Sequence, residues 1–202
     1  MRDIPGENTP ENVQIIIDET KRLTNLVNDM LDLSKLQAGV QELHAVSMNL
    51  TDEIRSIIER YETLLKQDEY DIRFEYREDV IIQGDVIKID QVIYNLINNA
   101  INYSGEDHQV IVKQLLEQGR VRIEIIDHGP GIEKDKLAYI WERYYKVDKT
   151  HVRSRVGSGL GLSIVKAVLE LHKAEYGVLS EEGVGSTFWF SLPYSKSQNE
   201  DG

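Results

Sequence analysis

The chain has 202 residues, which is enough for one ordinary domain with an appendage and for a sizeable buried core. Its 35 acidic and 23 basic residues give a net charge of −12, which disfavours non-specific binding to nucleic acid or to an anionic membrane surface. Cysteine is absent, so disulfides, thiolate catalysis and cysteine-based zinc sites are excluded. We find neither a secretory signal nor an apolar run near the roughly 20 residues that cross a bilayer, and we expect a soluble chain.

A loop over residues 1–9 and a long helix over residues 10–39 are predicted first. Thr9 is the expected N-cap, Pro10 the first helical residue and Gly39 the stop signal. Apolar residues recur at spacings of three and four, and together they form a stripe too broad for one helix to bury. We therefore predict a partner in a bundle or hairpin; packing of the helix on its own domain is the alternative.

The remaining segments predict a linker over residues 40–48, a domain over residues 49–194 and a disordered tail over residues 195–202. Periodicity predicts helices from Asn49 or Thr51, over 86–103 and over 162–171, strands over 72–76 and 80–82, and hairpins over 110–126 and 175–192. Helices and antiparallel strands segregate along the chain. The predicted fold is an α/β (α+β) two-layer sandwich, with a mixed, largely antiparallel sheet covered by helices on one face.

The helix over residues 86–103 has a polar face rich in asparagine. Four asparagines within eight residues cost about 2 kcal/mol of helix stability relative to alanine, which a merely solvated face would not need. Asn95 and Asn99 stand one turn apart, so their amide oxygens could hold a hydrated Mg²⁺ and their donors could reach phosphate oxygens. A wet surface helix of biased composition is the alternative interpretation.

Asp127 follows a predicted strand and precedes a Gly-Pro-Gly turn. A carboxylate at a strand end can accept a hydrogen bond from the exocyclic amine of adenine, and Gly129 and Gly131 would let the backbone approach the base. Ordinary turn chemistry explains the same residues without a ligand.

Gly157, Gly159 and Gly161 precede the next predicted helix, whose N-terminus could hold phosphate. The run is not a Walker A loop, because Leu162 stands where lysine would follow glycine, and no strand precedes it as in a Rossmann turn. Five Lys and Arg residues between Arg143 and Arg155 would suit a mobile cover over a triphosphate, although a solvated loop would contain them as readily.

The order of these segments resembles the catalytic core of bacterial sensor histidine kinases, in the superfamily that includes gyrase, mismatch-repair and heat-shock ATPases. The resemblance covers nearly the whole chain. Its motifs are the N box at residues 91–100, the G1 box at 127–131, the F box at 141–145, the G2 box at 157–162 and a terminal glycine motif at 183–188. Residues 10–39 resemble the second helix of the dimerisation and phosphoacceptor hairpin.

By this resemblance, Asn99 would bind Mg²⁺, Asn95 would contact the metal or the phosphates, and Asp127 would recognise adenine. Lys146 and Arg143 would act with Asn95 on the phosphates during catalysis. The further residues that the resemblance places at the nucleotide are Tyr103, Gly129, Gly131, Ile132, Tyr145, Gly157, Gly159, Leu160, Gly161, Leu162 and Thr187.

Three departures from the family pattern concern the acceptor, the helix over residues 86–103 and a turn. None of the five histidines has the acidic residue and later proline that follow the phosphoaccepting histidine, so we expect the acceptor to be absent from this chain. Asn102 stands where a lysine is frequent, which shifts any γ-phosphate contact toward the basic residues of the cover. Lys173 and Ala174 replace a common glycine pair, a change expected to affect only a turn.

The implied function is the ATP-binding catalytic portion of a two-component sensor histidine kinase, with ATP and Mg²⁺ as cofactors. It would phosphorylate a histidine on a hairpin helix outside this chain, for relay to a response regulator receiver domain. The intact protein would be a homodimer through its hairpin helices, cytoplasmic at this portion, membrane-anchored elsewhere, and without a nucleic-acid partner.

Three other functions are alternatives to this one. A gyrase-like ATPase clamp would need a glutamate as general base where Asn95 stands, and a serine kinase that controls a sigma factor would lack the long first helix. A nucleotide-binding module without catalytic activity is the remaining alternative.

Overall fold

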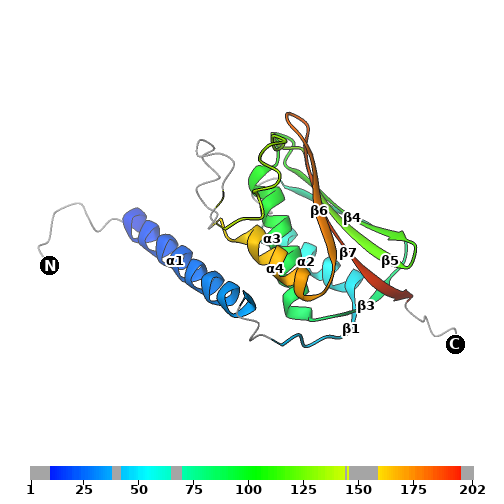
Figure 1. The fold of residues 1–202 in the computed structure, drawn as a ribbon. Coiled ribbons are helices and arrows are strands. Elements are labelled where there is room, and N and C mark those ends of the chain that lie inside the picture. Colours follow the sequence, from blue (N-terminus) through cyan, green and yellow to red (C-terminus); the bar gives the residue numbers. More distant parts are fainter. Residues whose placement is uncertain (1–9, 38–41, 65–69, 144, 146–158, 197–202) are drawn as a thin grey trace, which may run out of the picture.

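A computed structural model describes residues 10–37, 42–64, 70–143, 145 and 159–196 (Figure 1). The elements in chain order are α1 Pro10–Gln37, β1 Val46–Asn49, α2 Leu50–Leu64, β2 Asp71–Glu75, β3 Val80–Gly84, α3 Val86–Tyr103, β4 Gln109–Glu117, β5 Arg120–Asp127, α4 Gly161–Leu171, β6 Glu175–Glu181 and β7 Gly185–Lys196. No helix among these residues is both long and apolar enough to span a bilayer.

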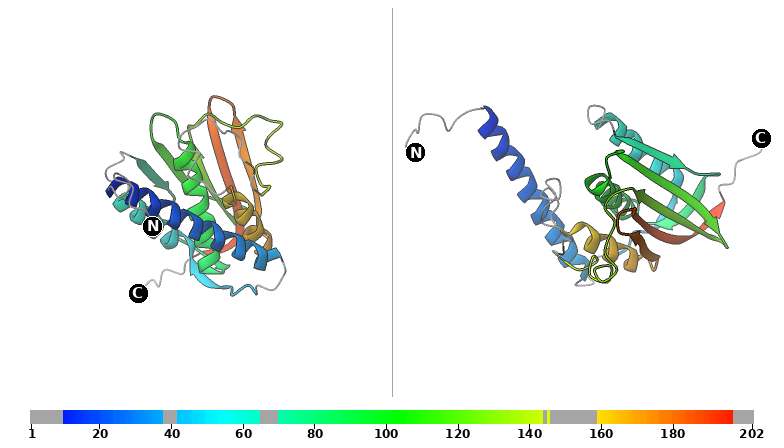
Figure 2. Two further views of the ribbon diagram at one scale, coloured as in Figure 1. Left: turned by 90° about the vertical axis from the view of Figure 1, so that its left-hand side faces the viewer. Right: turned by 90° about the horizontal axis from the view of Figure 1, so that it is seen from above.

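The strands form one mixed sheet in the order β1-β3-β7-β5-β4-β2, and β6 also pairs with β7. Of the described pairs, β2 with β4 is parallel and the others are antiparallel. Burial along β5 alternates residue by residue, as expected for a strand with one face on a core. The predicted sandwich is confirmed, with α2, α3 and α4 packed against one face of the sheet (Figures 1 and 2).

The core lies between that sheet face and the three helices. Its fully buried side chains are mostly branched aliphatic residues, with two phenylalanines from β7. Those at its centre are Val92, Ile93, Leu96, Val112, Val121, Ile123, Ile125, Ile164, Val165, Val168, Phe188 and Phe190. Because α3 and α4 contribute to this core along much of their length, packing fixes how both helices sit on the sheet.

Helix α1 projects away from the domain and meets it only near its C-terminal end (Figure 2). Leu33 is buried at 2% exposure and belongs to the core, and α1 contacts α4 there. The more N-terminal apolar side chains, including Val13, Ile16, Leu23 and Val27, remain exposed. The domain therefore leaves the N-terminal part of the apolar stripe of α1 uncovered, and the pairing of α1 in a bundle stays a prediction.

Two predicted boundaries need correction. The segment expected to be a linker contains β1, whose Met48 is buried and pairs with Ile82 of β3. The tail expected to begin at Ser195 is still strand there, because Ser195 pairs with Ile81. Both segments are strand because they pair with β3, and local periodicity does not reveal such pairing. Residues 197–202 lie outside the described part of the chain.

Candidate functional site

Asp127 is the last residue of β5 and is 3% exposed. Its Oδ1 accepts the Gly129 N–H at 2.9 Å. Burial raises the pKa of this carboxyl to about 6, and hydrogen bonds from the backbones of Gly129 and Ser186 oppose that rise. A carboxylate has about four acceptor sites, so Asp127 can still accept a hydrogen bond from the amine of a ligand.

The turn after Asp127 requires glycine at two positions. A Cβ on Gly129 would lie 1.8 Å from the carbonyl oxygen of Tyr103, so this turn lies directly against the end of α3. Gly131 has φ +71°, and a Cβ there would lie 2.1 Å from the carbonyl oxygen of Glu181. Backbone packing on both sides therefore fixes this turn, and the predicted residue Tyr103 lies next to it.

Asn95 brings the N box and the G2 box together. Its side chain is half-buried, and its Oδ1 lies 3.3 Å from the position of a Cβ on Gly161, the first residue of α4. Asn99 is half-buried one turn further along α3. From Asn95 to Tyr103 the helix rises about 12 Å, so one helix can reach both the phosphate end and the base end of an extended nucleotide.

Asn98 has a structural contact that the sequence did not indicate. Its Oδ1 accepts the hydroxyl of Tyr61 from α2 at 2.8 Å. The ring of Tyr61 also packs against Tyr94, with ring centroids 5.0 Å apart. Part of the asparagine enrichment on α3 therefore serves packing between helices.

The N-terminus of α4 has the features of an anion site. Gly159 has φ +73°, and Leu160, which is fully buried, stands at the N-cap. A leucine side chain has no group that could cap the first-turn N–H donors of a helix. Together with the helix dipole, these donors favour a phosphate group at this end.

The other predicted residues are only partly placed at this site. Arg143 is exposed, Leu162 is half-buried on α4, and the half-buried Tyr145 packs on Tyr139 with ring centroids 6.1 Å apart. Thr187 of β7 is paired with Ile126. Lys146 and Gly157 lie outside the described residues, and no described contact joins Arg143 to Asn95 or Asp127.

Two features near Asp127 were missed by sequence reasoning. His128 Nδ1 lies 2.7 Å from Asp107 Oδ2 and lowers the pKa of that carboxyl, which links the turn to the loop after α3. Ser180 accepts the Ile132 N–H at 2.8 Å. Neither contact has a local sequence signal, since each joins segments at least 20 residues apart.

The polar side chains at this site fit an oxygen-coordinated metal ion that is held mainly by the phosphates of a bound substrate. Within the described residues, no group of three or more His, Asp or Glu side chains could hold a metal. The two amide oxygens of Asn95 and Asn99 could supply part of a coordination shell, and Mg²⁺ ordinarily completes its shell with water and substrate phosphates.

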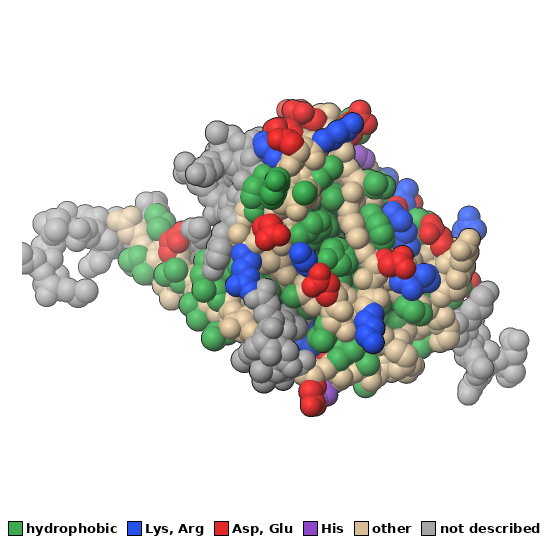
Figure 3. Space-filling view, in the orientation of Figure 1, with side chains coloured by type: hydrophobic (Ala, Val, Ile, Leu, Met, Phe, Trp, Pro, Cys, Tyr) green, Lys and Arg blue, Asp and Glu red, His purple; other side chains and the backbone are tan. Residues whose placement is uncertain are grey.

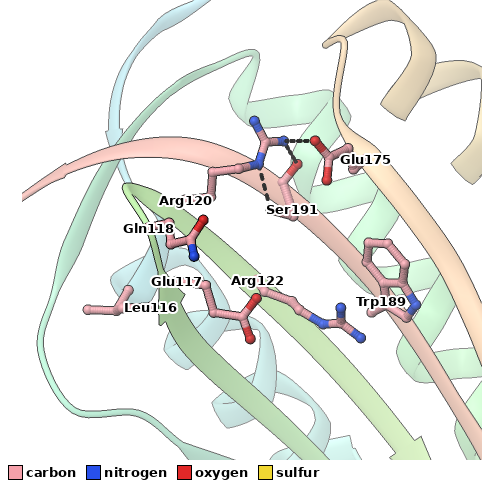
Figure 4. Close-up of a pocket in the computed structure, with 8 residues that line it drawn as sticks. All are labelled: Leu116, Glu117, Gln118, Arg120, Arg122, Glu175, Trp189 and Ser191. Atoms are coloured by element: carbon pink, nitrogen blue, oxygen red, sulfur yellow. Dashed lines mark hydrogen bonds and ion pairs between the residues drawn. The ribbon is translucent and has the colours of Figure 1, made fainter.

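A hollow lies on the sheet face opposite the helices (Figure 4). It has a volume of about 710 Å³, and several of its side chains contact one another. Arg120 donates to the Ser191 carbonyl at 2.8 Å, and the guanidinium of Arg122 lies 4.0 Å from the ring centroid of Trp189. Figure 3 shows acidic and basic side chains interspersed over the visible surface. This hollow lacks the buried carboxylate and glycine turn of the Asp127 site.

Comparisons with known proteins agree with this geometry. Residues 84–196 match the family model described as histidine kinase-, DNA gyrase B- and HSP90-like ATPase, and residues 1–39 match the His Kinase A (phospho-acceptor) domain. The sensor histidine kinase WalK of Bacillus subtilis (strain 168) is 34% identical over 194 residues, which cover 95% of this chain and 32% of WalK. The chain thus spans about a third of the length of this relative.

Two solved structures share the arrangement over nearly the whole chain. Full-length ShkA in complex with AMPPNP has a TM-score of 0.79 and 28% identity, covering 95% of this chain and 41% of ShkA. The histidine kinase ThkA in complex with response regulator protein TrrA has a TM-score of 0.74 and 26% identity, covering 98% of this chain and 54% of that one. From its fold, its motifs and these matches, the chain belongs to the histidine kinase-, DNA gyrase B- and HSP90-like ATPases and corresponds to the ATP-binding catalytic portion of a sensor histidine kinase.

Proposed function

We propose that this chain binds ATP with Mg²⁺ and, within the intact protein, phosphorylates a histidine on a hairpin helix outside these 202 residues. An imidazole nitrogen forms a bond to the γ-phosphorus, the bond from that phosphorus to the bridging oxygen of ADP breaks, and ADP leaves. The observation that carries the proposal is the buried Asp127 carboxylate at a glycine turn, joined by α3 to the Asn95 and Gly161 contact.

Each end of the nucleotide has its own group of residues in this proposal. Asp127 accepts the exocyclic amine of adenine, and Gly129 lets its turn pack directly on the Tyr103 carbonyl, which keeps Asp127 beside the end of α3. Because Asp127 is buried and cannot move away, it favours a base with an amine donor at that point over one with a carbonyl. The proposed base contacts also include Gly131, Ile132, Tyr145 and Thr187.

The triphosphate lies toward α4 in this proposal. The N–H groups of the first turn of α4 bind phosphate oxygens, and Asn95 and Asn99 orient the hydrated metal. The G2-box residues proposed for this end are Gly157, Gly159, Leu160, Gly161 and Leu162. Bound Mg²⁺ supplies charge neutralisation on the phosphates, and Arg143 and Lys146 would add to it.

The proposed partners follow from α1 and from the solved relatives. The exposed apolar stripe of α1 supports a homodimer in which hairpin helices bury it. ThkA was solved with the response regulator TrrA, and we infer a receiver domain as the phosphoryl acceptor downstream of this chain. We place the chain in the cytoplasm as part of a membrane-anchored sensor.

An ATPase clamp is less well supported. Hydrolysis needs a general base to activate water, and an amide such as Asn95 cannot accept a proton in that role. The long α1 likewise favours the hairpin of a sensor kinase over a domain that acts without one.

A binding and transfer experiment tests the proposal. Calorimetric titration with a non-hydrolysable ATP analogue, with and without Mg²⁺, should give saturable one-to-one binding that Mg²⁺ strengthens. The chain should then phosphorylate a supplied hairpin that carries an acceptor histidine. Failure to bind up to millimolar concentration would reject the proposal, and binding without transfer would leave a nucleotide-binding module.

A further inference from the structure

Two turns lie against each other beside Asp127, and we refer to them as the interlocked turns. The first is residues 127–132, and the second is residues 181–185, which join β6 to β7. The Gly183 N–H donates to the Pro130 carbonyl at 2.7 Å. Since a Cβ on Gly131 would meet the second turn at 2.1 Å, the two backbones are in direct contact.

Ser180 of β6 is hydrogen-bonded to both interlocked turns. Its hydroxyl oxygen accepts the Ile132 N–H at 2.8 Å and donates to the Gly185 carbonyl at 2.9 Å. The Ser186 hydroxyl lies 3.0 Å away. A hydroxyl has one donor and two acceptor positions, so with Ser186 as a second donor every position on Ser180 is used.

The two backbone partners of Ser180 lead directly to Asp127. Ile132 ends the turn that Asp127 begins. On the other side, a Cβ on Gly185 would lie 2.1 Å from the Asp127 carbonyl oxygen, and Ser186 is paired with Asp127 across the sheet. One hydroxyl therefore connects the far end of the turn to the strand that flanks its beginning.

We propose that Ser180 is a positioning residue of the nucleotide site, whose hydroxyl fixes the interlocked turns so that Asp127 and Gly129 are held ready for the base. This inference rests on the proposed ATP binding. Without the hydroxyl, the Ile132 N–H loses its partner and the turn can shift, and preorganised binding groups lose affinity when they are displaced.

The test compares Ser180→Ala and the size-matched Ser180→Cys, whose thiol is a weak hydrogen-bonding group, with Ser180→Thr, which retains the hydroxyl. Ser191→Ala is the control, because Ser191 is also a β-sheet serine with a side-chain hydrogen bond, but it is buried and bonds Arg120, away from the interlocked turns. Affinity for a non-hydrolysable ATP analogue is measured by calorimetry. Amide hydrogen exchange at Gly129 and Ile132 is measured without nucleotide.

We expect Ser180→Ala and Ser180→Cys to weaken binding about tenfold and to speed exchange at both amides, with Ser180→Thr close to wild type. Ser191→Ala should leave affinity and exchange at the turn unchanged. Wild-type affinity in Ser180→Ala or Ser180→Cys, or an equal loss in Ser191→Ala, would overturn the inference. If the wild-type chain bound no nucleotide, the proposed function would fail, and unchanged exchange at Ile132 would separately reject the positioning role.

Discussion

The buried Asp127 carboxylate should lower stability and strengthen nucleotide binding, and the substitution Asp127→Asn measures both effects. Burial raises the pKa of the folded carboxyl to about 6, whereas an unfolded aspartate has an ordinary pKa of about 3.9. The folded chain therefore keeps the proton to higher pH than the unfolded chain. The stability that the neutral carboxyl contributes is present below about pH 4 and is lost as pH rises through about 6.

The size of this effect follows from the difference between the two pKa values. A difference of about 2 pH units corresponds to about 3 kcal/mol of destabilisation once the carboxyl is ionised in both states. Asparagine can still accept the Gly129 N–H through its amide oxygen and carries no charge. Asp127→Asn should therefore be more stable than wild type at pH 8, by up to about 3 kcal/mol, and the gain should shrink by about half at pH 5.

The assay is urea unfolding of both proteins from pH 5 to pH 8, followed by circular dichroism. Asp107→Asn serves as the control of opposite sign, because the bond from His128 lowers the pKa of the exposed Asp107 carboxyl. That substitution should reduce stability by an amount that stays constant from pH 5 to pH 8, because the contribution of a carboxyl with a lowered pKa is lost only as pH falls below about 4. A pH-independent difference for Asp127→Asn, or a loss of stability at pH 8, would refute the reasoning.

Asp127→Asn should also weaken the binding of ATP and of ADP alike, since the two nucleotides share the base. If the variant bound both as tightly as wild type does, Asp127 would be excluded from the base site. With the expected results, stability and binding change in opposite directions at one residue. That is the pattern expected when a buried charge is retained for function.

Three other substitutions test separate parts of the structure. Lys173 has φ +54° in a Schellman turn, in which the Ala174 N–H donates to the Leu169 carbonyl at 2.9 Å. Lys173→Gly should therefore raise the free energy of unfolding in urea by about 1 kcal/mol, whereas Lys173→Ala should leave it unchanged. Gly129→Ala should lower stability by about 1–3 kcal/mol because of the overlap with Tyr103; an unchanged melting temperature would contradict that packing. Asn99→Ala should weaken Mg²⁺-dependent nucleotide binding in calorimetry, and unchanged affinity would exclude its metal role.

The helices and hairpins were predictable because their signals are local. The predicted helix over residues 86–103 coincides with α3, and Asp85 caps it by accepting the Lys88 N–H at 3.3 Å. Alternation also located β4 and β5, which pair as the predicted hairpin. Helical and strand periodicities report burial within a few residues, so one face against a core is enough to reveal them.

Contacts between distant segments were not predictable in the same way. Strand β1 exists because it pairs with β3, and Asn98 of α3 bonds Tyr61 of α2 although its type suggested a ligand-binding face. Lys173 occupies a left-handed conformation where the family often has glycine, and only the backbone angle shows that this turn is strained.

The sequence by itself determined the element types, the coverage of one sheet face by helices and the residue types suited to a nucleotide. Hydrophobic periodicity, turn glycines and hydrogen-bonding side chains can each be recognised from residues close together in the sequence. Tertiary structure decided that Asn95 meets Gly161, that Gly129 meets Tyr103, and that Asp127 loses its contact with water. Such contacts arise only when the sheet and the helices pack. Burial then sets the pKa of Asp127, a property that no neighbouring residue in the sequence encodes.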